Sequence, residues 1–123
     1  MGEGVLVDTD VLIDYVRGRR GLPEAVWYLS EITLYEFIRG SSDPGRAKEL
    51  LEEEFIVLFH DNEVIRSAAA IWRVLKAQGA LVEDRDLLIA ATAISKGLPL
   101  LTGNTKHFAR FKEFGLRLHG ERA

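Results

Sequence analysis

The sequence VLVDTDVLID at residues 5–14 joins a short apolar run to three polar residues and then to a helix-like segment. A continuous apolar run of this length is typical of a buried strand in a parallel sheet. Asp8 therefore stands at the carboxyl end of a predicted first strand, the end at which open α/β sheets bind ligands. Asp8 or Asp10 could instead only cap the following helix, and we predict this capping role for Asp10 at least in part.

In the rest of the chain, short apolar runs continue to alternate with helix-like segments. Short apolar runs recur at residues 26–29, 55–59 and 98–101, with a weaker one at 115–119. Between them lie segments with helix caps, at 10–17, 30–40, 43–53, 61–77 and 84–96, and a short helical turn after Asn104. With no internal repeat or linker, this order predicts a single α/β domain over residues 1–123, with helices on both faces of a parallel sheet.

Composition narrows the class of protein. Of the 123 residues, 47% are hydrophobic and 28% charged, as is ordinary for a globular domain. The formal charge of 16 − 19 = −3 argues against a protein that coats nucleic acid through bulk electrostatics. With no cysteine, a disulfide, a thiolate zinc site and a thiol nucleophile are excluded. We expect a cytoplasmic protein without a membrane partner, since no apolar run could span a bilayer and the N-terminus has no export signal.

Further oxygen-bearing side chains occupy corresponding positions along the chain. Glu36 lies within the apolar run ITLYEFI, and Asp84 and Asp86 open the predicted helix at 84–96. Thr102 and Asn104 follow the strand at 98–101. Each has a plainer interpretation: Glu36 on a solvated face, the two aspartates as residues of a helix start, and Thr102 and Asn104 as turn residues.

Taken together, these positions favour a metal site. Carboxylates on apolar elements destabilise a fold unless a charge compensates them. Hard cations such as Mg²⁺ bind carboxylate oxygens, waters and substrate phosphates, and a bound cation can polarise a phosphate and activate water. The sequence therefore predicts a divalent metal site at one edge of the sheet.

The same stretches resemble the motifs of the PIN-domain metal-dependent ribonucleases, and more narrowly of the VapC-type toxins of toxin–antitoxin pairs. VDTDVLID (7–14) is similar to the opening motif D-T-N/D-x-L-I-D, and SEITLYE (30–36) is similar to S-x-I-T-x-x-E. DRDLLIAATAISKGLPLLTGNTKHF (84–108) is similar to D-x-L-I-A-A-x-A followed by a T-x-N/D-x-x-x-F strand end. The resemblance covers almost the whole chain, and the combination of motifs is specific.

The resemblance implies a metal-binding core of Asp8, Glu36 and Asp86 for Mg²⁺ or Mn²⁺, with Asn104 as a fourth catalytic position. The residues expected around this core are Thr9, Asp10, Asp84 and Thr102. Two positions depart from the family pattern. Asp10 stands where Asn is frequent, and Asn104 removes a fourth carboxylate, which leaves the binding of a second metal open.

The implied fold is a three-layer α/β/α domain around a parallel sheet of about five strands. The implied activity is hydrolysis of RNA phosphodiesters by a metal-activated water, and the implied partners are RNA, an antitoxin protein and a second copy in a homodimer. Basic residues near the motifs could bind RNA phosphates or simply be solvated: Arg17, Arg39, Arg85 and Lys106. The three histidines show no ligand spacing, and we assign them no role.

Three other functions remain open. A haloacid-dehalogenase-like phosphatase also begins with a strand and D-x-D, here Asp8-Thr9-Asp10, but position 12 is Leu where Thr or Val is expected, and the required lysine motif is missing. A catalytically inactive PIN scaffold would act as a binding module and would show no stabilisation by Mg²⁺ or Mn²⁺. An RNA-processing nuclease outside any toxin–antitoxin pair would share the whole acidic set.

Overall fold

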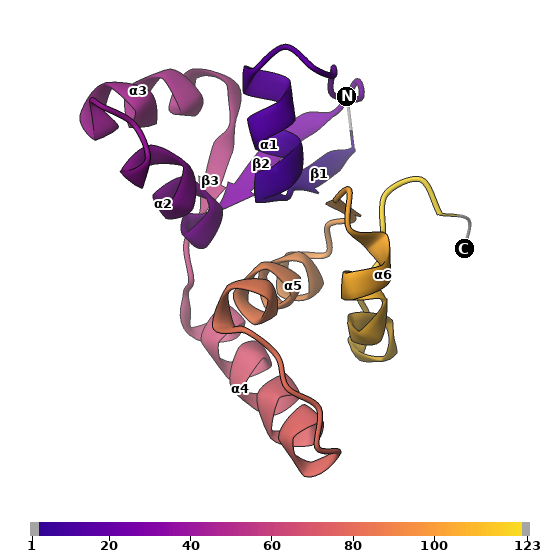
Figure 1. Ribbon diagram of the computed structural model, residues 1–123. Coiled ribbons are helices and arrows are strands. Elements are labelled where there is room, and N and C mark those ends of the chain that lie inside the picture. Colours follow the sequence, from indigo (N-terminus) through magenta and orange to yellow (C-terminus); the bar gives the residue numbers. More distant parts are fainter. Residues whose placement is uncertain (1–2, 122–123) are drawn as a thin grey trace.

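The structure, a computed structural model, describes residues 3–121 and is built on a parallel sheet (Figure 1). Within those residues the strands are β1 (Gly4–Val7), β2 (Val26–Ser30), β3 (Ile56–Leu58) and β4 (Leu100–Leu101), in the order β3-β2-β1-β4. All three neighbouring pairs run parallel. The continuous apolar runs of the sequence thus mark parallel strands, as predicted. The prediction of burial is confirmed for β1 and β4 but not for the edge strand β3, where Ile56 is exposed.

The expectation of about five strands was wrong, because the sheet has four strands within residues 3–121. The predicted strand at 115–119 makes one parallel bridge, between Leu100 and Leu118. His119 N donates to Leu100 O (2.8 Å) and Leu100 N donates to Arg117 O (2.9 Å). Since β4 is only two residues long, it offers too short an edge for a further ladder.

Helices cover both faces of the sheet (Figure 1). The helices are α1 (Thr9–Val16), α2 (Glu31–Arg39), α3 (Pro44–Glu54), α4 (Asn62–Ala77), α5 (Asp84–Lys96), α6 (Thr105–Phe108) and the 3-10 helix η1 (Ala109–Phe114). Alternate residues of β1 belong to two separate cores: Val5 and Val7 pack with α1, α2 and α3, and Leu6 packs with α4, α5, α6 and η1. The domain therefore has the three α/β/α layers that the sequence predicts.

Most predicted helix caps are confirmed, and two are wrong. Ser30 caps α2, Asp43 caps α3 and Asp61 caps α4, each through its side chain. The cap of α1 is Asp8 rather than Asp10, because the chain is already helical at Thr9. The cap position of α5 is Glu83, without a side-chain hydrogen bond, so Asp84 lies inside the first turn.

The strand order decides where a site can form. The chain runs outward from β1 through β2 to β3 and then returns to place β4 on the other side of β1. Such a reversal leaves a crevice outside the carboxyl ends of the strands on either side of it. Asp8 follows β1 and Thr102 follows β4, so both residues border this crevice.

Among the described residues, no helix combines the length and apolarity required to cross a bilayer.

Candidate active site: three carboxylates around one arginine

Asp8 is held in place at the end of β1 by the strands themselves. Its backbone N–H donates to Leu101 O (2.9 Å), and its carboxylate accepts hydrogen bonds from Thr9 N on Oδ1 and Thr102 Oγ1 on Oδ2, both at 2.8 Å. The residue is only 2% exposed. Burial raises the pKa of Asp8 from 3.8 to about 6, against the opposing effect of the Thr102 hydrogen bond, and the nearby charge of Asp10 raises it further.

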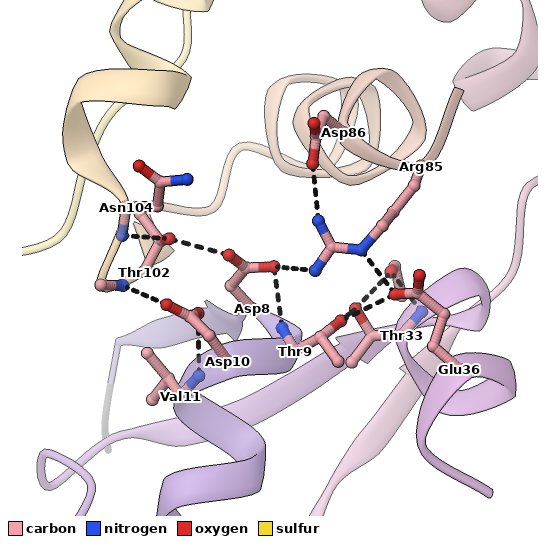
Figure 2. Close-up of polar contacts among 12 residues, drawn as sticks. Asp8, Thr9, Asp10, Val11, Thr33, Glu36, Arg85, Asp86, Thr102 and Asn104 are labelled. Atoms are coloured by element: carbon pink, nitrogen blue, oxygen red, sulfur yellow. Dashed lines mark hydrogen bonds and ion pairs between the residues drawn. The ribbon is translucent and has the colours of Figure 1, made fainter. Parts of the chain in front are cut away.

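Glu36 reaches the same edge of the sheet from α2. Its side chain is 16% exposed and faces the carboxyl end of β1 rather than open solvent (Figure 2). The Thr9 hydroxyl lies 3.1 Å from Glu36 Oε1 and 3.1 Å from Thr33 Oγ1. Thr33 is fully buried and was not singled out in the sequence, where a threonine in a helical segment carries no distinctive signal.

Asp86 enters from the first turn of α5 and is 3% exposed. Its Oδ2 lies 2.6 Å from Nε2 of His107 in α6, which leaves Oδ1 directed toward the centre. His107 is therefore a site residue to which sequence reasoning assigned no role. Its position three residues after Asn104 was the one available signal, and a lone histidine is a weak one.

Arg85 joins the three carboxylates. Its Nε lies 2.7 Å from Glu36 Oε1, its Nη1 lies 2.6 Å from Asp86 Oδ1, and its Nη2 lies 3.5 Å from Asp8 Oδ1 (Figure 2). Burial opposes the charge on Arg85, but the hydrogen bond to Glu36 and the surrounding carboxylates raise its pKa above the usual value. One guanidinium facing three ionised carboxylates leaves a formal charge of 1 − 3 = −2.

The centre has the donor chemistry of a magnesium or manganese site. It offers carboxylate oxygens from three different elements, all aimed at one cationic group. As they stand, no three His, Asp or Glu side chains in residues 3–121 are close enough to share one ion. The guanidinium lies between the carboxylates and bridges them, so the residues fit a divalent cation in kind while Arg85 occupies the space among them.

Asp10 and Thr102 connect the two loops that border the centre. Asp10 Oδ1 accepts a hydrogen bond from Val11 N (2.8 Å), and its Oδ2 accepts one from Gly103 N (3.1 Å). Thr102 Oγ1 also accepts from Asn104 N (3.0 Å). The side-chain amide of Asn104 makes no contact among the residues drawn in Figure 2, although its backbone belongs to this network.

Other predicted site residues lie outside the carboxylate cluster. Asp84 lines a surface hollow with Ile65 and Trp72 between α4 and α5. Of the four basic residues expected to bind RNA, Arg85 enters the acidic centre. Arg17 lines a surface hollow together with Glu36. The guanidinium of Arg39 lies 5.1 Å from the ring centroid of Tyr35. Lys106 is exposed on α6.

Comparison with known proteins shows which family the chain resembles. The model of the PIN domain matches residues 5–113. Ribonuclease VapC1 of Methanocaldococcus jannaschii is 46% identical over 117 residues, which cover 94% of this chain and 86% of that protein. Ribonuclease VapC1 of Rickettsia felis is 32% identical over 124 residues, covering 89% of this chain and 91% of that protein.

Solved structures agree with the sequence relatives. The structure of VapBC-1 from nontypeable Haemophilus influenzae aligns with a TM-score of 0.79 at 29% identity, covering 94% of this chain and 96% of that one. DNA-bound VapBC from Salmonella typhimurium aligns with a TM-score of 0.75 at 28% identity, covering 95% and 97%. By its sequence over nearly its whole length, and by its fold, the chain belongs to the PIN domain family and within it groups with the VapC proteins.

Proposed function

We propose that this protein is a metal-dependent endoribonuclease and the toxin of a VapBC-type toxin–antitoxin pair. The observation that carries the proposal is the meeting of Asp8, Glu36 and Asp86 around a single cation at the carboxyl end of the sheet. A purely structural ion pair has no need of three acids gathered at a topological switch point, whereas a metal ion that activates water for phosphodiester hydrolysis is typically held by such carboxylates. The relatives named ribonuclease VapC support the same activity.

In this proposal Asp8, Glu36 and Asp86 hold Mg²⁺ or Mn²⁺, and Asn104 supplies a fourth polar position. When bound, the cation would polarise the phosphate and lower the pKa of a water molecule. The remaining residues prepare the ligands. Thr102 and Thr9 fix the orientation of Asp8 and Glu36, and Asp10 holds the loop at Gly103 against α1.

The RNA would be held by basic side chains near the centre. We assign this role to Arg17, Arg39 and Lys106, and to Arg85 whenever its guanidinium is free of the carboxylates. Arginine suits such contacts because its planar fork can donate two hydrogen bonds to one phosphate. The chain's formal charge of −3 means that these contacts are local, so binding by bulk attraction is not expected.

The proposed partners follow from the solved relatives. Several of the aligned structures are VapBC complexes, and one is described as a toxin-antitoxin complex from Klebsiella pneumoniae. We therefore include a cognate antitoxin protein in the proposal. We also propose a homodimeric state, which the resemblance to VapC-type toxins implies, and a cytoplasmic location.

The phosphatase alternative receives no support. The match to the PIN domain over residues 5–113 and the relatives named ribonuclease VapC are inconsistent with that alternative.

The test is cleavage of a panel of fluorescent single-stranded and hairpin RNAs with Mn²⁺, with Mg²⁺ and with EDTA. We expect cleavage that requires metal and is lost in Asp8→Asn. Asp14→Asn is the matched control, because Asp14 lies on α1, the helix that Asp8 caps, but is at the surface in an ion pair with Arg19. Cleavage that survives in a folded Asp8→Asn protein, or that persists in EDTA, would exclude this site as the source of the activity.

A further inference from the structure

Arg85 is anchored unlike an ordinary structural counterion. Three of its nitrogens face three different carboxylates, which come from the end of β1, from α2 and from α5. It therefore joins elements that are far apart in the sequence, since Glu36 and Arg85 are separated by 49 positions. Removing this cation would leave three buried or half-buried acids facing one another, a costly arrangement.

The exposure of the partners is asymmetric. The Arg85 side chain is 31% exposed, whereas those of Asp8, Glu36 and Asp86 are 3%, 16% and 5% exposed. The carboxylates are fixed from behind by Thr102, Thr9 and His107, so they cannot easily turn away. Arg85 reaches in from the solvent side and can leave without disturbing the core.

The backbone position of Arg85 also favours its departure. It is the second residue of α5, in the turn where the helix dipole favours negative charge and opposes positive charge. The Arg85 guanidinium is therefore held in the centre by its contacts with the three carboxylates. A divalent cation that binds the same carboxylate oxygens would compete directly with the guanidinium.

We propose that the Arg85 guanidinium takes the place of the divalent cation among Asp8, Glu36 and Asp86 in the metal-free protein, and that cation binding displaces it. This inference rests on the proposed metal dependence of the site. Arg85 is then a positioning residue with two consequences. It keeps the ligands gathered before metal arrives, and it lowers the apparent affinity for metal, because metal binding is an exchange of one cation for another.

The experiment compares wild type, Arg85→Met, Arg85→Lys and the surface control Arg19→Met by calorimetric titration of the purified full chain with Mg²⁺. We expect Arg85→Met to bind Mg²⁺ about tenfold more tightly than wild type, which corresponds to ~1.4 kcal/mol. Arg85→Lys should lie between the two, because an ammonium keeps the charge but cannot face three separate carboxylates. Arg19→Met removes the same charge from an exposed ion pair and should match wild type.

A second measurement reports the displacement itself. In ¹⁵N spectra the Arg85 Nε–H signal, assigned by its absence in Arg85→Met, should be resolved and protected in metal-free protein. At saturating Mg²⁺ it should move to the position of solvent-exposed arginines. An unmoved signal at saturation, or equal Mg²⁺ affinity in wild type, Arg85→Met and Arg85→Lys, would overturn the exchange while leaving the metal site intact.

The same data separate the two proposals. If neither wild type nor Arg85→Met binds Mg²⁺, and Asp8→Asn gives the same flat titration, the proposed metal dependence fails and the exchange fails with it. If Arg85→Met does not fold, Arg85→Lys and the wild-type Nε–H signal still decide the question, because neither requires removal of the positive charge.

Discussion

Thr102 Oγ1 lies 2.8 Å from Asp8 Oδ2, although 94 positions separate the two residues in the sequence. The contact joins the carboxyl ends of β1 and β4, which are neighbours in the sheet. It places a hydrogen-bond donor on a carboxylate that burial would otherwise leave poorly solvated. The Asp8–Thr102 pair therefore links the topology of the sheet to the ionisation of the acidic centre.

Thr102→Val should weaken both stability and metal binding. The valine keeps the shape but removes the donor to Asp8 and the acceptor for Asn104 N, at a cost of about 1–3 kcal/mol in the free energy of unfolding. In wild type the hydrogen bond from Thr102 lowers the pKa of Asp8. In the valine variant that pKa should therefore be higher, and Mg²⁺ binding should shift to higher pH. Thermal denaturation and Mg²⁺ titrations at several pH values test this.

Two variants control for Thr102→Val. Thr105→Val makes the same chemical change at an exposed position of α6 and should leave both measurements unchanged. Thr102→Ser restores the hydroxyl and should recover the wild-type pH dependence of metal binding. A Ser variant that behaves like Val would attribute the effect to packing rather than to the hydrogen bond.

His107→Phe should impair metal binding while largely preserving the fold. The phenyl ring can keep the edge-on contact with Phe108, whose ring centroid lies 5.7 Å away, but it loses the 2.6 Å contact with Asp86 Oδ2. Residues that orient a metal-binding carboxylate contribute roughly 10- to 100-fold to affinity or activity. Calorimetry with Mg²⁺ should show a loss in this range, and exposed His119→Phe should show none.

Much of the fold could be predicted because continuous apolar runs favour strands of a parallel sheet, and β1 to β4 all arise from such runs, although Ile56 in the edge strand β3 is exposed. The missing fifth strand depends on pairing instead. Residues 115–119 look strand-like in isolation, but the length of their neighbour β4 decides whether a ladder can form. The helix caps show a similar limit, since Asp8 and Asp10 are chemically identical candidates two residues apart.

Some residues of the acidic centre could likewise be predicted from the sequence, and others could not. Asp8 and Asp86 come together because strand ends and helix starts meet at one edge of a parallel sheet, and Glu36 joins them across α2. The inward direction of Arg85 could not be predicted, because a charged residue beside an acidic motif looks the same whether it faces water or the core. The role of His107 could not be predicted from the sequence either, because its contact with Asp86 depends on how α6 packs beside α5.

Gly4→Ala should destabilise the sheet without changing the chemistry of the site. A Cβ at this position would lie 2.6 Å from Tyr28 Cε2 and 2.7 Å from Leu98 Cδ2, so β1 or its neighbours must shift. Overpacking of this kind costs about 1–3 kcal/mol. Gly21→Ala, whose Cβ would meet nothing within 4 Å, is the control. Chemical denaturation should separate the two, and unequal Mg²⁺ affinities at a temperature where both are folded would contradict this assignment.

The charge on Asp8 should make metal-free stability depend on pH in an unusual direction. Its folded-state pKa is about 6, raised by burial above the ordinary 3.8, so the folded protein binds the Asp8 proton more tightly than the unfolded chain does. The resulting stabilisation is fully present below pH 3.8 and is lost as pH rises through about 6. At neutral pH the ionised Asp8 therefore destabilises the metal-free fold, by an amount on the order of 3 kcal/mol.

Asp8→Asn should accordingly be more stable than wild type at neutral pH in EDTA, and the two stabilities should converge as the pH falls below the range of this titration. Asparagine can still accept the hydrogen bond from Thr9 N, and the Thr102 hydroxyl can accept from its amide. Saturating Mg²⁺ should reverse the order by stabilising only the protein that retains the carboxylate. Denaturation curves across pH, with and without Mg²⁺, measure both effects, and Asp14→Asn should follow wild type throughout. A constant stability difference between Asp8→Asn and wild type at all pH values would show that Asp8 does not carry this titration.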